Sequence, residues 1–560
     1  MDYKKYIAEK LNIEGVSQEE VYSLIVLPPD TTLGDFALPC FKFAKIMRKA
    51  PQMIAEDLKN LYPTDEVISK VTAVNGYLNF TVNRGDLITN VIDKILSEGE
   101  NYGASDLGKD KTVVIDYSSI NIAKPFHIGH LSTTVIGGAL YRIYKYLGYN
   151  VVGVNHLGDY STQFGKLIYA YKRWGDKETV EKLRVKELMR LYVMYHDEAE
   201  KDPTLDDIAR SYFKKIENGD KECIEIFNWF KELTLKDVKK VYDDLDIQFD
   251  SYNGESFYND KMQPVIDELG EKGLLVESEG AKIVDLEKYD MPPCLILRSD
   301  GASLYATRDL AAAVYRKNTY DFYKCLYVVA YQQNLHFKQF FKVLDLMGKP
   351  WAKDMEHVAF GMVSLEDGTM STRKGKVVFL EDVINKCVEK AYGIINEKNP
   401  DLENKEETAK AVGVGAVIFG ALSSARIKDI VFSYDKVLNF DGETGPYVQY
   451  TYARCCSLLN KGGEIGSYGE VNLTDIEYSL INELNKFPSV VESAAEKNEP
   501  CFITRYAIDL ASCFNKFYFD CKILGESDDV KNFRLTLTKC TKTVIKNALS
   551  LLGIKTPEKM

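Results

Sequence analysis

One stretch of the sequence limits the possible folds more than any other: residues 112–155 contain a strand, a helix and a second strand in succession. Residues 112–119 (TVVIDYSS) form an apolar run that indicates a buried strand, and residues 131–147 repeat apolar side chains at the helical period. Gly148 then favours a helix end, and residues 150–155 (NVVGVN) indicate another strand. Two strands joined by a helix in this way are parallel. The sequence therefore predicts an α/β fold built on a parallel sheet.

The second half of this sheet is predicted further along the chain. Strand patterns at 324–330 and 356–363 are separated by a helical pattern at 337–347. Between the two halves, residues 166–290 carry mostly charged helical patterns, followed by a hairpin-like stretch around Asp300-Gly301. We interpret this region as a long helical insertion into one sheet.

The two ends of the chain predict separate domains. Near the N-terminus we expect a helix at 50–61 and strands at 67–74 and 77–82 around the turn Asn75-Gly76, closed by the polar linker 101–111. From residue 406 onward the pattern is almost entirely helical. The expected domains are a small α/β domain at 1–105, a larger α/β domain with the inserted segment at 106–405 and an all-helical domain at 406–560.

Composition narrows the class of protein and its compartment. Of 560 residues, 45% are hydrophobic and 28% charged, which suits a folded globular chain and excludes a disordered one. The longest uncharged stretches, 125–141 and 411–425, are shorter than the roughly 20 apolar residues of a spanning helix.

The charged N-terminus is unlike a signal peptide. Eleven cysteines form no CxxC pair and no His/Cys cluster, so we expect a reduced cytoplasmic chain with no structural metal and no membrane partner.

The net charge of −12 argues against a protein that coats nucleic acid without specificity. The net charge is still compatible with a nucleic-acid partner that binds to a local basic patch.

The tetrapeptide His127-Ile128-Gly129-His130 lies between the first strand and its helix. This position is at the carboxyl edge of the predicted parallel sheet, where such folds bind ligands. A helix N-terminus also attracts phosphate. Two imidazoles there can donate hydrogen bonds to phosphate oxygens, and Gly129 lets a flat base approach the backbone. The alternative is that the histidines are surface caps of the helix. Two of them flanking a glycine favour the binding interpretation.

Five blocks of sequence carry a family resemblance, in order along the chain. They are SSINIAKPFHIGH (118–130), NHLGDYSTQFG (155–165), DGASLYATRD (300–309), FDGETGPY (440–447) and LLGIKTP (551–557). Together they resemble the class I aminoacyl-tRNA synthetases in their arginyl-tRNA synthetase form, whose HIGH signature is matched by residues 127–130. The resemblance implies a Rossmann-type catalytic domain with a long insertion, an N-terminal domain that contacts tRNA and a helical anticodon-binding domain.

Class I enzymes carry a second, lysine-rich signature loop that closes over the triphosphate. Residues 369–373 (TMSTR) align with it, and neither family lysine is present. Arginyl-tRNA synthetases that lack the loop lysine usually carry one just before the HIGH motif, where this chain has Lys124. Charge that builds at the α-phosphate requires a cation, and we predict that Lys124 supplies it. A solvated, flexible loop is the alternative interpretation of residues 370–376.

The expected catalytic residues are His127, His130, Lys124, Arg373 and Lys374, and the expected ATP-binding residues are His127, Gly129, His130, Met370 and Ser371.

A guanidinium group is best bound by carboxylates, so acidic residues are expected near the sheet edge. By resemblance, the arginine-binding positions are Asn121, Glu255, Tyr305, Asp309 and Gln333. Each has a plainer interpretation taken alone: Asn121 as a turn residue, Glu255 as part of a surface turn and Asp309 as a helix N-cap. Gln332 competes with its neighbour for the last position.

A tRNA partner requires a local positive surface on this acidic chain. Residues 531–555 contain six basic side chains and no acidic one, with Lys539, Lys542 and Lys546 on one helix face. An alternative interpretation, given equal weight, is that these lysines form an ordinary solvated helix face. Tyr447, Tyr450 and Tyr452 can offer surfaces for base stacking, although any one tyrosine of 36 can equally belong to the core.

The resemblance implies an arginine–tRNA ligase that uses ATP and Mg²⁺ to form arginyl-adenylate and then transfers arginine to the terminal adenosine of tRNA(Arg). We expect a monomer whose partners are tRNA(Arg), L-arginine and ATP. Two alternatives stay open: an adenylating ligase on the same fold that needs no tRNA, and a catalytically decayed RNA-binding paralogue. The departure in the second loop is the only support for the paralogue.

Overall fold

The computed structural model describes residues 3–28, 33–298, 305–366, 378–469 and 471–560. The chain divides into two compact units. Unit 1 comprises 1–102, 454–488 and 509–547, and unit 2 comprises 103–453, 489–508 and 548–560.

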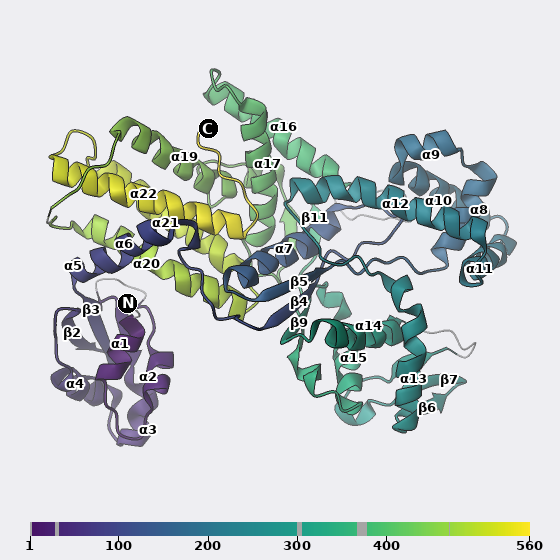
Figure 1. The fold of residues 1–560 in the computed structure, drawn as a ribbon, viewed down its shortest axis with the longest axis horizontal. Coiled ribbons are helices and arrows are strands. Elements are labelled where there is room, and N and C mark those ends of the chain that lie inside the picture. Colours follow the sequence, from purple (N-terminus) through teal and green to yellow (C-terminus); the bar gives the residue numbers. More distant parts are fainter. Residues whose placement is uncertain (1–2, 29–32, 299–304, 367–377, 470) are drawn as a thin grey trace. The chain divides into compact units, whose positions relative to one another are not determined.

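Unit 2 is built on a four-stranded parallel sheet with the order β10-β9-β4-β5. Its strands are β4 (Thr112–Asp116), β5 (Asn150–Val154), β9 (Lys324–Tyr327) and β10 (Met355–His357). Helix α7 (Leu131–Tyr146) joins β4 to β5, and α15 (Asn334–Leu346) joins β9 to β10. The two connections run outward from the middle of the sheet in opposite directions, so right-handed crossovers place α7 and α15 on opposite faces (Figure 1). The predicted parallel α/β fold is confirmed, and its topological switch point lies between β4 and β9.

Helix α7 packs unusually close to the first strand. Most of its residues are buried, as expected of a helix covered by other elements on several sides. A Cβ at Gly137 would lie 2.2 Å from the ring of Tyr117, directly after β4, so only glycine permits this approach. Gly148, at φ +80°, ends the helix as predicted.

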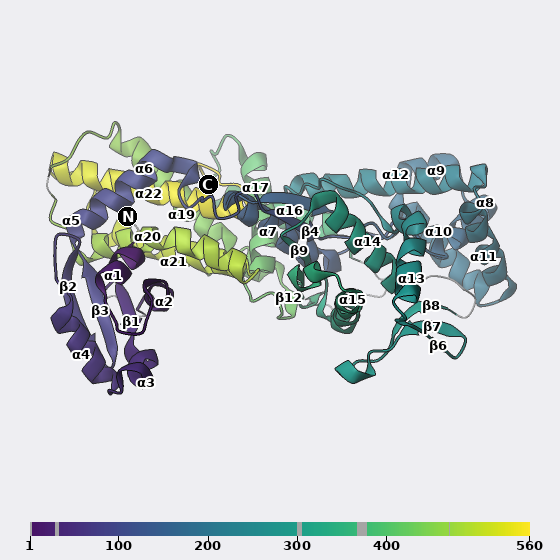
Figure 2. The same ribbon diagram turned by 60° about the horizontal axis from the view of Figure 1, so that its bottom comes forward.

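A helical bundle is inserted after β5 (Figure 2). The chain leaves the sheet at Val154 and returns at Ser251, and these two residues form a parallel bridge. The Asn155 amide donates to the Ser251 carbonyl oxygen at 2.9 Å. The bundle consists of α8 (Gln163–Trp174), α9 (Lys177–Leu183), α10 (Val185–Ala199), α11 (Thr204–Glu217) and α12 (Lys221–Asp244).

The helical interpretation of residues 166–290 is wrong in its last part. After α13 (Met262–Glu271) the chain forms a three-stranded antiparallel sheet of β6 (Leu275–Ser278), β7 (Ala281–Val284) and β8 (Cys294–Leu297). The turn between β6 and β7 places Glu279 at φ +51° and Gly280 at φ +80°, as a tight hairpin requires. Half of the residues of β6 and β7 are exposed, and the charged residues Glu277 and Lys282 interrupt the apolar pattern, so the alternation was too weak to predict these two strands. The hairpin expected around Asp300-Gly301 lies outside the described residues.

The strand expected at 356–363 is divided in the structure. Its start is β10, whereas its last residue begins β11 (Val363–Leu365), which pairs in parallel with β12 (Ile430–Phe432) outside the four-stranded sheet. Helix α14 (Tyr305–Tyr320) precedes β9. The next three helices after β11 are α16 (Leu380–Lys398), α17 (Lys405–Leu422) and α18 (Tyr434–Val437).

Unit 1 contains a three-stranded antiparallel sheet with the order β1-β3-β2. Asn75 (φ +50°) and Gly76 (φ +81°) form its tight turn, as predicted. Its strands are β1 (Phe36–Pro39), β2 (Ile68–Val74) and β3 (Tyr77–Val82), and its short helices are α1 (Tyr3–Lys10), α2 (Gln18–Leu24), α3 (Ala44–Met47), α4 (Pro51–Leu61), α5 (Arg84–Leu87) and α6 (Asp93–Glu98).

Four long helices make up most of the C-terminal region, as the sequence predicts. They are α19 (Gly445–Gly462), α20 (Asp475–Glu496), α21 (Cys501–Asp520) and α22 (Asp528–Leu551). Within the described ranges, none of the helices is both long enough and apolar enough to cross a membrane.

Candidate functional site

The two signature histidines lie at the switch point of the sheet, in a short 3₁₀ turn (Ile128–His130) that leads into α7. The Gly129 amide donates to Nδ1 of His127 at 3.0 Å, and the His127 amide donates to Nδ1 of His130 at 3.2 Å. The two rings lie 4.0 Å apart between centroids. The histidines do cap the turn, as the plainer interpretation holds, but they do so with one nitrogen each.

Both imidazoles are held in the neutral state. Burial lowers the pKa of His127 to about 4, and the charge of Lys124 adds to this effect. Burial and the neighbouring His127 lower the pKa of His130 to about 3. Because Nδ1 of each ring accepts a backbone hydrogen bond, each neutral ring must carry its proton on Nε2. Each Nε2–H is then a donor that caps no part of the turn.

The loop before the histidines has an unusual backbone. Ser118, Ser119 and Ala123 have φ values of +68°, +44° and +58°. Non-glycine residues adopt this region at a cost that surrounding contacts must offset. The Ser118 amide donates to Oγ1 of Thr133 at 3.0 Å, and its hydroxyl lies 2.7 Å from Tyr242 Oη, on α12. The loop is therefore fixed from both α7 and the insertion.

Lys124 lies in this loop, half-buried. Burial lowers the pKa of its ammonium group, and the charge of Glu255 acts in the opposite direction. It lines a cavity of about 260 Å³ together with Lys182, Arg184 and Lys186 from the insertion. A cation is thus present beside the histidines at the place where the sequence predicts one.

The second signature loop falls outside the described residues, including Met370, Ser371, Arg373 and Lys374. The residues directly after it are described, and there His127 and Phe379 form an antiparallel bridge. The Ile128 amide donates to the Val378 carbonyl oxygen at 3.1 Å. The chain therefore leaves this segment directly beside the HIGH residues.

Glu255 is positioned by the second resemblance block, residues 155–165. Its amide donates to the Leu157 carbonyl oxygen at 2.9 Å. The next residue, Ser256, donates through both its amide and its hydroxyl to the buried carboxylate of Asp159, at 2.9 and 2.8 Å. A Cβ at Gly254 would lie 2.6 Å from the Leu157 carbonyl oxygen, so this turn requires glycine. Glu255 is therefore held in place rather than part of a loose surface turn.

Burial raises the pKa of Glu255 to about 7, although Arg308 lowers it. The two side chains form a long ion pair, with Nη1 of Arg308 3.5 Å from Oε2 of Glu255. Arg308 is 9% exposed and lies 4.8 Å from the ring centre of Tyr160. This arginine was not among the residues predicted from the sequence. Its place directly before Asp309 in the block DGASLYATRD was the available signal.

Asp309 lies in the second turn of α14, whose first described residue is Tyr305, so the N-cap interpretation of Asp309 is wrong. The two residues are four apart on one helix face, and Tyr305 is 62% exposed. Asp309 contacts His336 on α15, with Oδ2 2.6 Å from Nε2. Burial lowers the pKa of His336, but the hydrogen bond and charge of Asp309 outweigh burial and raise it overall. No role was predicted for His336 from the sequence.

Asn121 and Gln333 lie at the two ends of this group. Asn121 forms a parallel bridge with Gly158, in the same segment that holds Glu255. Gln333 ends the turn that precedes α15, the helix of His336, and its side chain is exposed. Asn121 and Glu255 thus both contact the segment 157–158, and Asp309 lies close enough to Glu255 for its charge to help raise the pKa of Glu255. Tyr305 lies one helical turn before Asp309, and Gln333 lies three residues before His336.

The residues predicted to contact tRNA fall in different units. Lys539, Lys542 and Lys546 all lie on α22, in unit 1. Lys539 is exposed, whereas Lys546 pairs with Glu100 at 2.5 Å. Tyr447 is half-buried near the start of α19, in unit 2. Tyr452 is only 3% exposed and belongs to the core.

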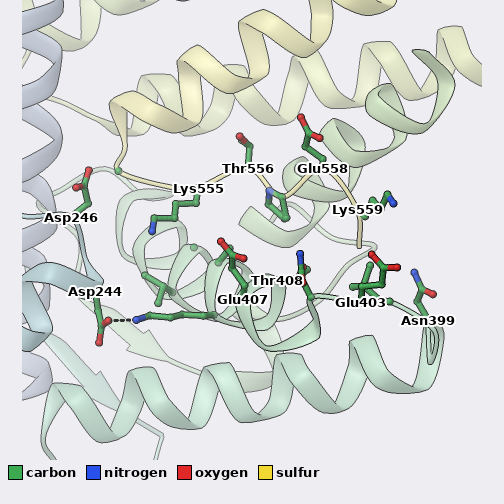
Figure 3. Close-up of a pocket in the computed structure, with 18 of the residues that line it drawn as sticks. Asp244, Asp246, Asn399, Glu403, Glu407, Thr408, Lys555, Thr556, Glu558 and Lys559 are labelled. Atoms are coloured by element: carbon green, nitrogen blue, oxygen red, sulfur yellow. Dashed lines mark ion pairs between the residues drawn. The ribbon is translucent and has the colours of Figure 1, made fainter. Parts of the chain in front are cut away.

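A separate cavity of about 740 Å³ lies among the end of α12, α17 and the C-terminal segment (Figure 3). Lys410 pairs there with Asp244 at 2.6 Å. Acidic side chains outnumber basic ones in its described lining, which makes it a poor site for a phosphate. The acidic ones are Asp244, Asp246, Asp401, Glu403, Glu407 and Glu558. None of the predicted site residues is among those described as lining it.

Comparisons with known proteins agree with the resemblance over the whole chain. A family model described as tRNA synthetases class I (R), catalytic domain, matches residues 91–434. The Arginyl tRNA synthetase N terminal domain matches residues 1–82, and the DALR anticodon binding domain matches residues 448–560.

Individual relatives give the same result. The arginine–tRNA ligase of Clostridioides difficile (strain 630) is 55% identical over 572 residues, covering all of both chains. That of Alkaliphilus metalliredigens (strain QYMF) is 53% identical over 565 residues, again covering both completely. Among solved structures, Thermus thermophilus arginyl-tRNA synthetase superposes with a TM-score of 0.86 at 26% identity, covering 100% of this chain and 99% of that one.

Proposed function

This chain belongs to the arginyl-tRNA synthetase family of class I enzymes, and from that premise we propose how its residues ligate L-arginine to tRNA(Arg). In the first step the arginine carboxylate attacks the α-phosphate of ATP, giving arginyl-adenylate and pyrophosphate. In the second step a ribose hydroxyl of the terminal tRNA adenosine attacks the activated carbonyl, giving arginyl-tRNA and AMP. The observation that carries this proposal is the pair of imidazoles at the switch point, each of which accepts a backbone hydrogen bond at Nδ1 and so keeps its Nε2–H outside the hydrogen bonds of the turn.

The proposed roles at ATP follow from charge. The Nε2–H groups of His127 and His130 donate to phosphate oxygens, and Lys124 offsets the negative charge that develops at the α-phosphate. Gly129 leaves the backbone open to the adenine ring. Met370, Ser371, Arg373 and Lys374 are proposed to close over the triphosphate. Mg²⁺ is proposed to arrive with ATP, because it commonly binds through substrate phosphates and it neutralises their charge there.

The proposed arginine pocket is the group of residues at the sheet edge. Glu255 and Asp309 bind the guanidinium group, and Tyr305 packs or donates beside it. Asn121 holds the backbone of the amino acid next to the HIGH residues, and Gln333 completes the pocket. Bidentate contacts with two carboxylates distinguish arginine from lysine, whose ammonium is a point charge.

For tRNA we propose that Lys539, Lys542 and Lys546 attract the anticodon arm, with Tyr447 as a stacking surface. The proposed domain boundaries remain 1–105, 106–405 and 406–560, and the enzyme is proposed to act in the cytoplasm as a monomer.

The experiment is arginine-dependent release of pyrophosphate from MgATP, with and without total tRNA. Release that requires arginine and tRNA together supports the whole proposal, including tRNA-dependent activation. Release with arginine alone supports adenylation but removes the requirement for tRNA in the first step. No release with arginine in either condition, from folded protein, would overturn the proposal in favour of a decayed paralogue.

A further inference from the structure

The contact between Asp309 and His336 joins two elements that the sequence does not connect. His336 lies on α15 and Asp309 on α14, 27 residues apart, with the 2.6 Å hydrogen bond between Nε2 and Oδ2. Both side chains are partly accessible, at 25% and 26% exposure. The pair therefore lies at the surface of the proposed pocket rather than in the core.

A single hydrogen bond from His336 leaves most of the carboxylate available. An ionised carboxylate can accept about four hydrogen bonds, and His336 uses one of them on Oδ2. Oδ1 and the remaining lone pair of Oδ2 can still accept a bidentate fork of guanidinium N–H donors. A carboxylate on a free side chain would have to lose its rotational freedom when arginine binds, and such ordering weakens affinity.

The imidazole is itself fixed by aromatic packing. Its ring is stacked on Phe340, with centroids 6.0 Å apart and an interplanar angle of 26°, and it meets Phe337 edge-on at 5.4 Å. Phe337 and Phe340 are buried on the same helix. The core of unit 2 thus fixes His336, and His336 in turn fixes Asp309.

We propose that His336 is a positioning residue for arginine: its Nε2–H fixes the Asp309 carboxylate in the orientation that receives the substrate guanidinium. This inference rests on the proposed function and deepens it. His336 acts on the substrate only indirectly, by orienting Asp309, and takes no part in the chemistry at the phosphate.

The test is steady-state kinetics of arginine-dependent pyrophosphate release in the presence of tRNA. For His336→Ala we expect KM for arginine to rise about tenfold, the effect of one lost orienting hydrogen bond near a charge. We expect kcat and KM for ATP to change less than twofold. His336→Gln retains an N–H donor at the position of Nε2, so it should restore KM for arginine to within about threefold of the wild type.

A double-mutant cycle separates positioning from packing. If His336 acts through Asp309, then adding His336→Ala to Asp309→Asn produces no further rise in KM for arginine. His357→Ala is the matched control, because His357 also stacks on Phe337, at 4.2 Å, but hydrogen-bonds to the Val329 carbonyl oxygen instead of Asp309. It should leave KM for arginine unchanged.

Three results would overturn the inference: an unchanged KM for arginine in His336→Ala, additive effects in the double variant, or an equal effect of His357→Ala. If His336→Ala does not fold, the contrast between His336→Gln and His336→Phe decides, since only the former keeps the donor. A wild-type enzyme with no arginine-dependent release would instead contradict the proposed function.

Discussion

At the scale of single residues, the hydrogen-bonding state of the two histidines determines what they can offer a ligand. Backbone amides occupy Nδ1 in both rings, and the pKa values of about 4 and 3 keep them neutral across the physiological range. Each ring therefore presents the same donor at every pH above about 5. In the proposed mechanism the pair provides directed hydrogen bonds, whereas Lys124 provides the positive charge.

This assignment of tautomers predicts which substitution is tolerated at His127. Glutamine places an N–H donor near the position of Nε2, whereas asparagine places it near Nδ1, where the Gly129 amide already donates. We expect His127→Asn to lose about 10²–10³-fold in kcat for pyrophosphate release, and His127→Gln to lose clearly less. Equal losses in the two variants would show that the Nε2–H is not the group used.

Glu255 predicts a dependence of arginine binding on pH. Its pKa of about 7 means that the carboxylate is half protonated at neutral pH, and a guanidinium group binds the ionised form. As the pH rises towards 7, we expect KM for arginine to fall about tenfold per pH unit, and above pH 7 we expect it to level off. Glu255→Gln should have a high KM at all pH values and a flatter profile, measured in buffers from pH 5.5 to 8.5. A wild-type profile as flat as that of the variant would contradict the assignment.

The same group affects stability with a definite sign. The pKa in the folded state lies above the ordinary value of an exposed glutamate, so the folded protein holds the proton more tightly than the unfolded chain. Its contribution to stability is complete below the ordinary pKa and is lost as the pH rises through about 7. Glu255→Gln should therefore raise Tm more at pH 8 than at pH 5 in the absence of substrates.

At the scale of elements, the turn before Glu255 links the sheet edge to the proposed arginine pocket. Gly254→Ala would place a methyl group 2.6 Å from the Leu157 carbonyl oxygen, and the buried carboxylate of Asp159 leaves the turn no room to shift. We expect a loss of about 1–3 kcal/mol in unfolding free energy and a rise in KM for arginine. Gly393→Ala is the matched control, since its Cβ would meet no atom within 4 Å. Denaturant unfolding and kinetics of both variants test this prediction.

The sequence predicts well those elements in which few polar residues interrupt the pattern of apolar side chains. β4 and α7 were predicted closely because most of their residues are buried, and β5 because its valines form a short apolar run. β6 and β7 were missed because exposed, charged residues such as Glu277 and Lys282 hide the alternation. The pocket could be named only by resemblance, since Asp159 and Ser256 contact each other across 97 residues of sequence. No local pattern indicates His336 as the partner of Asp309.

At the scale of the whole molecule, an acidic chain must bind a polyanion. With a net charge of −12, affinity for tRNA depends on local cations and falls as salt rises. Lys539→Glu should raise KM for tRNA several-fold and weaken its salt dependence, with KM for arginine and ATP unchanged. Lys282→Glu, an equal charge change at an exposed position of β7, is the control. Equal effects of the two variants would mean that net charge, rather than the α22 surface, governs tRNA binding.

The bridge between Val154 and Ser251 has a consequence for how the family can vary. The helical insertion leaves and re-enters the sheet at neighbouring positions, so its two ends are fixed a strand spacing apart whatever lies between them. Closing a longer segment across such a gap costs only a slowly growing entropy. The bundle can therefore lengthen or shrink over evolution without moving its two ends, provided that α12 keeps the contact of Tyr242 with the loop before the histidines.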